Sequence, residues 1–414
     1  MPRSSKPSTR KNRKRSHGKG HQKGLSPEVQ EAMRRIESIL SAETINCDEL
    51  RKEVAERGAP ARQLRRRVWP LLLDVNVDDF DEAGYLEAAN GSHRDSSVVE
   101  VDVQRSLWAF TANWPEAKRE ASRQSLKRLL NATVGSLQDV YYYQGLHDIA
   151  SVLLLILGEH MAYAALRTLT TAHLRDFTRP TLEPVKEVLE LLHPLLAKHD
   201  RQLHDFIECC EERQNLDMGL FDRRASRAER QAARSPPYFA IAWVITWFSH
   251  SVQSLPAACR LFDLFFASHP LMPLYVATVS MSHGRQSIME CGEDDFPGVH
   301  SSLKNLDIFS LISADQLAQE SLGLFRRFPP SSLRRAAKRR GLHLSSDTKS
   351  AWVPDSVRSV KDVALPSPKP PWEIVEDRLQ FMPSLRSTAA VVSILGLTLL
   401  SVYQMYLIDG RSKL

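Results

Sequence analysis

Asp102 and Arg105 are the first pair of side chains whose types and spacing could do chemistry. Because they lie three residues apart, they would be neighbours on one face of a helix. A guanidinium supplies a fixed positive charge and several donors in a planar fork, which suits it to bind anionic oxygens. Taken alone, the pair is more typical of a surface ion pair that stabilises a helix by about 0.3–0.5 kcal/mol.

Gln144 is the second candidate, because it ends a run of three tyrosines (141–143) and precedes Gly145. The Gln-Gly pair indicates a tight turn that enters a helix, since residues 146–158 are nearly all apolar. A carboxamide can donate and accept hydrogen bonds at the same time. Taken alone, these residues also fit a packing cluster whose amide caps its own backbone.

A helix must position Asp102 and Arg105. Ser97, followed three residues later by Glu100, is typical of a capping box and predicts a helix that begins at about Val98. The apolar residues that follow recur at steps of three and four, which indicates a buried stripe. Its members are Val99, Val103, Leu107 and Phe110. We therefore expect one helix over residues 98–110.

The same helical periodicity recurs along most of the chain, and no sustained period-two alternation or Asn-Gly hairpin signal interrupts it. The sequence therefore predicts an all-α fold. Besides residues 26–40 and 98–110, the periodic segments are 64–73, 122–134, 146–158, 182–197, 238–252, 256–266 and 315–328.

Composition divides the chain into parts. Residues 1–24 contain nine Lys/Arg and no acidic residue, so subtracting nine from the net charge of +6 leaves −3 for the rest. We expect this basic tail to be disordered, and we expect no nucleic-acid-binding domain. An N-terminal helical segment (25–59) and a main domain (60–330) follow, and the main domain carries a charged insertion at 211–235. Residues 331–386 are rich in Arg, Lys, Ser and Pro, which is typical of a flexible linker.

Residues 387–408 are predicted to form a transmembrane tail anchor. From Thr388 to Ile408 the chain has 21 residues without a charge, enough for a helix of about 31 Å across a hydrocarbon core of about 30 Å. A short tail (409–414) follows, so the bulk of the chain would be cytosolic. The final Ser-Lys-Leu matches a peroxisomal address, but a receptor could not reach it across the membrane.

Metal and cofactor motifs are not found in the sequence. None of the five cysteines forms a CxxC pair, and no HExxH run is present. We therefore expect neither a metal site nor a cofactor of the chain's own.

Three motifs in order resemble those of TBC domains. Residues 99–105 resemble their I-x-x-D-x-x-R motif, with Val99 in place of Ile, and Tyr142-x-Gln144-Gly145 is identical to their Y-x-Q-G motif. Arg65-x-x-x-Trp69 resembles the opening R-x-x-x-W motif. The resemblance covers about residues 60–330 and implies a multi-helix TBC domain.

TBC domains accelerate GTP hydrolysis by Rab GTPases, so the resemblance implies a GTPase activator whose partner is a Rab in its GTP form. Arg105 would stabilise charge that develops on the nucleotide, and Gln144 would align the attacking water. Asp102 would orient Arg105, and Gly145 would let the backbone approach the partner. The GTP and Mg²⁺ would be carried by the partner.

The resemblance also implies early secretory traffic at the endoplasmic reticulum membrane, with the Golgi, the nuclear envelope or the peroxisome as alternative locations. A non-catalytic membrane scaffold that only binds a Rab is the alternative function.

Overall fold

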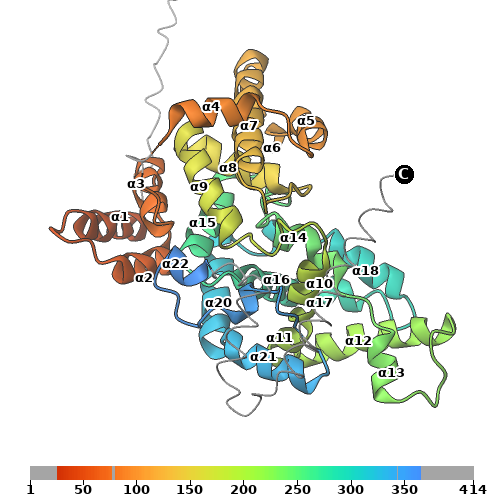
Figure 1. Ribbon diagram of the computed structural model, residues 1–414. Helices are drawn as coiled ribbons and strands as arrows, with labels where there is room; N and C mark the ends of the chain where they lie inside the picture. The colour runs from red at the N-terminus through yellow and green to blue at the C-terminus, as the bar shows by residue number, and fades with distance from the viewer. Residues whose placement is uncertain (1–25, 77–79, 343, 365–414) are drawn as a thin grey trace, which may run out of the picture. The chain divides into compact units, whose positions relative to one another are not determined.

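The computed structural model describes residues 26–76, 80–342 and 344–364, and within these ranges every regular element is a helix (Figure 1). The all-α prediction is confirmed for these residues. The helices are α1 (Pro27–Leu40), α2 (Cys47–Arg57), α3 (Arg62–Leu72), α4 (Glu82–Asn90), α5 (Ser96–Gln104), α6 (Trp108–Thr111), α7 (Glu116–Gly135), α8 (Leu146–Leu157), α9 (Glu159–Thr171), α10 (Glu183–Glu190), α11 (Leu192–His199), α12 (Arg201–Asp217), α13 (Arg227–Ala232), η1 (Tyr238–Ala240), α14 (Ile241–Ile245), α15 (Leu255–Phe266), α16 (Met272–His283), α17 (Arg285–Met289), α18 (Phe296–Lys304), α19 (Ile308–Leu311), α20 (Ala314–Arg327), α21 (Pro330–Arg339), η2 (Ser350–Trp352) and α22 (Val360–Val363).

Helix α8 is the central element of the first half of the fold. Nearly every residue of this helix is buried, because α3, α5, α7 and α9 pack around it. Helix α7 also packs against α4 and α5, and Figure 1 shows these helices gathered beside α8. The helix that carries Asp102 is thereby fixed against the helix that follows Gln144.

The second half is built on α15, α16 and α20, which pack against one another and against α2 and α11. Aromatic side chains fill the region where it meets α3. Trp69 lies 5.0 Å, centroid to centroid, from Phe266, and Trp247 lies 5.2 Å from Phe265. Such large rings bury much apolar area and pack edge to face, so they hold the two halves in one core.

The prediction of a flexible linker from residue 331 is wrong for residues 331–364. This segment forms α21, η2 and α22 and buries Leu333, Val353 and Val363 in the core. Polar contacts hold it as well, since Arg51 Nε donates to the carbonyl of Arg358 at 2.7 Å. Composition did not predict that this segment packs on the domain, because the few apolar residues that it buries stand among many basic ones.

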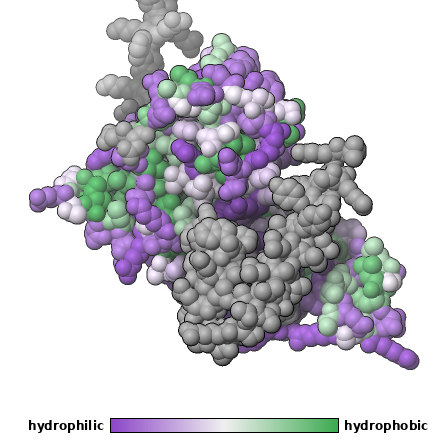
Figure 2. All heavy atoms as spheres, in the orientation of Figure 1, coloured by the Kyte–Doolittle hydropathy of each residue, from purple (hydrophilic) through white to green (hydrophobic). Residues whose placement is uncertain are grey.

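Insertion 211–235 comprises the end of α12, a loop and α13. Most of its residues are exposed, although Glu211 and Asn215 are buried. Met218 and Leu220 are exposed apolar side chains in the loop, and Figure 2 shows apolar surface near this end of the molecule. The insertion is therefore solvated without being uniformly polar.

Several predictions fall on residues that the structure does not describe. These are the basic tail 1–24, the linker remainder 365–386, the tail anchor 387–408 and the tail 409–414. Among the described residues, no helix combines the length and apolar character that crossing a membrane requires.

Candidate functional site

Arg105 and Gln144 line the same surface pocket, although they lie 39 residues apart in the chain. The pocket has a volume of about 480 Å³. Three segments border it: residues 105–110, residues 144–151 and residues 241–250. The two side chains proposed from the sequence therefore border one opening to solvent.

Arg105 projects from the end of a helix and not from its middle. Helix α5 ends at Gln104, Arg105 is its C-cap, and Leu107 has a φ of 72° in the left-handed region. The prediction of one continuous helix over 98–110 is therefore wrong, as is its predicted start, because Asp95 is the N-cap. The chain turns at Leu107, and the side chain of this residue is buried there. The turn leaves the Arg105 side chain 55% exposed.

Asp102 holds the Arg105 guanidinium from inside the protein. Its side chain is only 2% exposed and forms an ion pair with Arg105. Tyr142 Oη donates to Asp102 Oδ2 at 2.7 Å, and His147 Nδ1 lies 3.3 Å from the same oxygen. A buried carboxylate needs such partners, and each of them fixes its orientation. The pair is thus part of a buried network and not an isolated surface ion pair.

The ionisation of this network follows from its burial. Burial and the hydrogen bond to Asp102 raise the pKa of Tyr142, so its hydroxyl stays protonated and can donate. Burial also lowers the pKa of His147, although Asp148 and Asp102 act in the opposite direction. His147 is therefore neutral near pH 7, and Arg105 is the cation of the network.

Gln144 is exposed at the turn that starts α8, and Gly145 shapes this turn. Gly145 has a φ of 120°, and a Cβ there would lie 2.8 Å from Thr246 Cγ2. Glycine is required because both this backbone angle and this close approach exclude a side chain. From the sequence we expected Gly145 to let the backbone approach a partner. Gly145 is buried, however, so the close approach is to Thr246 of the same chain.

The third wall of the pocket, formed by residues 241–250, was not predicted from the sequence. The helix predicted over 238–252 is confirmed only as far as Ile245, through η1 and α14, and it is wrong beyond that residue. There the chain turns through Trp247 and Phe248, whose φ angles are 50° and 62°. Tyr143 Oη donates to the carbonyl of Ile245 at 2.9 Å, which ties the wall to the Gln144 turn. His250 then lies at the pocket.

Trp108 and His250 are further exposed pocket residues that the sequence analysis did not single out. The Trp108 side chain is half-exposed, and the guanidinium carbon of Arg119 lies 3.9 Å from the centroid of its ring. Exposed tryptophans are frequent anchors of protein interfaces. The only sequence signal was that the Trp lies three residues beyond Arg105.

Arg65, Trp69 and Val99 are buried and do not line the pocket. Arg65 Nη2 lies 2.8 Å from Asp263 Oδ2, and Trp69 Nε1 donates to Asp263 Oδ1 at 2.7 Å. Asp263 itself has no exposed surface. These residues therefore support the fold, and they cannot contact a partner directly.

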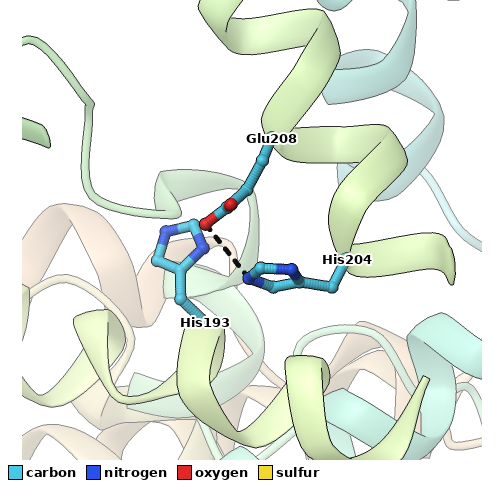
Figure 3. A group of neighbouring side chains, drawn as sticks. All are labelled: His193, His204 and Glu208. Atoms are coloured by element: carbon cyan, nitrogen blue, oxygen red, sulfur yellow. Dashed lines mark ion pairs between the residues drawn. The ribbon is translucent and has the colours of Figure 1, made fainter. Parts of the chain in front are cut away.

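One side-chain group among the described residues has the composition of a metal site. His193 from α11 and His204 and Glu208 from α12 point toward one another, with their ligand atoms within 4.8 Å (Figure 3). Glu208 is already paired with the guanidiniums of Arg234 and Arg340, and Arg340 Nη1 lies 3.2 Å from His204 Nε2. We assign no metal to this group, because a cation would meet two positive charges there.

Comparisons with known proteins are consistent with the geometry. A model of the Rab-GTPase-TBC domain matches residues 62–223. TBC1 domain family member 20 from Bos taurus is 33% identical over 303 residues, which are 73% of this chain and 68% of that protein. GTPase-activating protein gyp10 from Schizosaccharomyces pombe is 30% identical over 298 residues, 72% of each chain. The crystal structure of the Ypt/Rab-GAP domain of Gyp1p shares the fold, with a TM-score of 0.54 at 16% identity over 72% of this chain and 99% of that one.

Proposed function

The chain belongs to the TBC-domain family of Rab GTPase-activating proteins, and we propose that it activates its partner by inserting Arg105 and Gln144 beside the partner's GTP. Membership in the family gives the coarse function, which is activation of a Rab GTPase. The observation that carries the finer proposal is that both side chains line one open pocket. The chain would supply catalytic groups to the partner's reaction and would hydrolyse no nucleotide by itself.

Arg105 would stabilise the transition state. Charge develops on the phosphate oxygens as the γ-phosphoryl group is transferred, and a guanidinium placed there lowers the barrier. The exposed end of α5 presents Arg105 outward, and Asp102 limits the orientations that its fork can take. A preorganised donor loses less conformational entropy when the complex forms.

Gln144 would position the attacking water. Its carboxamide can accept a hydrogen bond from the water and donate one to a phosphate oxygen. The turn at Gly145, next to Gln144, packs closely against Thr246, which restricts the positions that this backbone can take. The partner supplies GTP and Mg²⁺, which is the usual division in this chemistry.

A single-turnover assay with a panel of GTP-loaded Rabs tests this proposal. Arg105→Ala should lower the stimulated rate by about 10³–10⁵-fold. Arg105→Lys should also fail, because an ammonium does not reproduce the planar fork. Gln144→Ala should lose activity while it still binds the GTP-loaded Rab. Full stimulation by Arg105→Ala would instead support the alternative of a non-catalytic scaffold.

We further propose that residues 387–408 anchor the chain to a membrane, with the endoplasmic reticulum as the expected location. The support is the uncharged sequence over 388–408 and the family resemblance described above. Prenylated Rabs lie on membrane surfaces, so anchoring would raise their effective concentration without any new contact.

A further inference from the structure

The turn that leads to His250 is held in a conformation that its residues disfavour. Trp247 and Phe248 both have positive φ angles, which bulky residues rarely adopt. The indole Nε1 of Trp247 is buried and finds no acceptor among the described residues. Such local strain persists only where the surroundings enforce it, and it is concentrated at functional sites.

The surroundings that enforce the turn are the aromatic core and one backbone hydrogen bond. Both rings are buried, and Trp247 packs against Phe262 and Phe265. The amide of Phe248 donates to the carbonyl of Trp243 at 2.8 Å. This packing reverses the chain and places His250 at the pocket that Arg105 and Gln144 line.

His250 is exposed and already oriented. Its side chain is 67% exposed, and its Nδ1 lies 3.2 Å from Asp148 Oδ2. A carboxylate on one ring nitrogen fixes the ring and leaves the other nitrogen free to act. Nε2 has no hydrogen-bond partner within the ranges that the structure describes.

The exposed hydrogen-bond donors around His250 suit an anionic ligand. Asp148 and His147 face it from α8, and Arg105 faces it from the end of α5. The carboxylate of Asp148 lies between the two histidines, because its Oδ2 is bonded to His250 and its Oδ1 lies 3.5 Å from His147 Nε2. The carboxylates of Asp102 and Asp148 are 2% and 21% exposed and are paired with Arg105 and His250, so the more exposed polar groups at the opening are these two side chains and the amide of Gln144.

We propose that His250, with both ring nitrogens protonated, is a third partner-contacting residue of this site, donating a hydrogen bond from Nε2 to an anionic oxygen of the GTP-loaded GTPase. The inference rests on the proposed function, since it places the partner over the same pocket. The anionic oxygen could belong to a nucleotide phosphate or to a carboxylate of the GTPase, and both have the same hydrogen-bond chemistry.

The experiment compares wild type, His250→Gln and His250→Ala on the Rab that responds best to the wild-type chain. His283→Gln is the matched control, because His283 is also partly exposed and bonded to a carboxylate (Glu320, 2.8 Å) but does not line the pocket. The readouts are kcat and KM of stimulated hydrolysis, binding of the Rab loaded with a non-hydrolysable GTP analogue, and the melting temperature.

Loss of a charge-assisted hydrogen bond should change the affected constant by roughly 10-fold. A rise in KM with an unchanged kcat would identify a carboxylate, whereas a fall in kcat would identify a phosphate. The hydrogen bond to Asp148 raises the pKa of His250, so wild-type activity should fall as the pH rises through that pKa. The His250→Gln variant should lack this fall, and His283→Gln should behave as wild type.

Wild-type values of kcat, KM and binding in both His250 variants would overturn the inference while leaving the proposed function intact. If the wild-type chain failed to stimulate any Rab, the proposed function would fail instead. Binding of the Rab that the wild-type chain binds most tightly would then still test His250, because unchanged affinity in His250→Ala would exclude the contact.

Discussion

Replacing Asp102 by asparagine should slow stimulated hydrolysis and leave the domain folded. Asparagine keeps the shape of the side chain but removes the charge that pairs with Arg105. A hydrogen bond to a charged group contributes about 1.5–3 kcal/mol. Because the Arg105 side chain is 55% exposed and water competes for it, we expect about 1–2 kcal/mol here. This corresponds to a rate reduction of roughly 5–30-fold.

The assay is a double-mutant cycle under single-turnover conditions. Asp102→Asn is measured in three backgrounds: wild type, Gln144→Ala and Arg105→Ala. If Asp102 acts by orienting Arg105, the substitution should cost the same factor in the Gln144→Ala background and nothing further once Arg105 is absent. High concentrations of the activator keep the slowest variants measurable.

An equal loss in the Arg105→Ala background would refute this reasoning, because Asp102 would then act through something other than the guanidinium. The competing explanation is structural, since Asp102 also accepts the hydroxyl of Tyr142 at 2.7 Å. A melting temperature and a circular dichroism spectrum of Asp102→Asn separate the two, and a fall in stability that accounts for the lost activity would favour the structural explanation.

Three further predictions concern stability and membrane attachment. Asp263→Asn leaves the buried Arg65 guanidinium without its counter-charge, so urea denaturation should show a loss of about 3–5 kcal/mol, and a loss below about 1 kcal/mol would contradict this. Burial and the neighbouring Glu211 raise the pKa of Glu190 to about 7, so its ionisation destabilises the fold fully above pH 7 and hardly at all below pH 4.5. Glu190→Gln should therefore stabilise the domain by about 1–3 kcal/mol at pH 8 and by little at pH 4, and a gain that is the same at both pH values would refute the assignment. Deleting residues 387–414 should leave activity in solution unchanged and abolish activity on membranes in cells, whereas equal cellular activity would remove the anchoring proposal.

The sequence predicted the pairing of Asp102 with Arg105 better than it predicted the overall geometry of the site. The spacing of Asp102 and Arg105 indicated that they would be neighbours, and the structure pairs them. The meeting of Arg105 with Gln144 could be expected only from the family resemblance, because no local pattern relates two turns 39 residues apart. Helical periodicity also predicted, wrongly, that the helix continues through Arg105. A stripe of apolar residues does not show that the backbone turns at one of its members, Leu107.

The third wall of the pocket was not predictable from local patterns. Residues 238–252 are strongly apolar, and such a run favours a helix when it is considered alone. The positive φ angles of Trp247 and Phe248 contradict the local preference of both residues. Tertiary packing against the core decides the conformation there, and that packing involves residues far away in the sequence.

The two proposed catalytic side chains, Arg105 and Gln144, are held in place by different interactions. Different substitutions should therefore disturb each of them. Arg105 depends on a buried carboxylate, so changes of charge in the Asp102 network should affect its orientation most. Gln144 depends on backbone shape, because Gly145 lies against Thr246 and Tyr143 bonds to Ile245. The Gln144 turn and the turn before His250 therefore share one set of contacts. Any shift of that third wall should move Gln144 and His250 together, and it would reach Arg105 only indirectly, through the contacts of Tyr142 and His147 with Asp102.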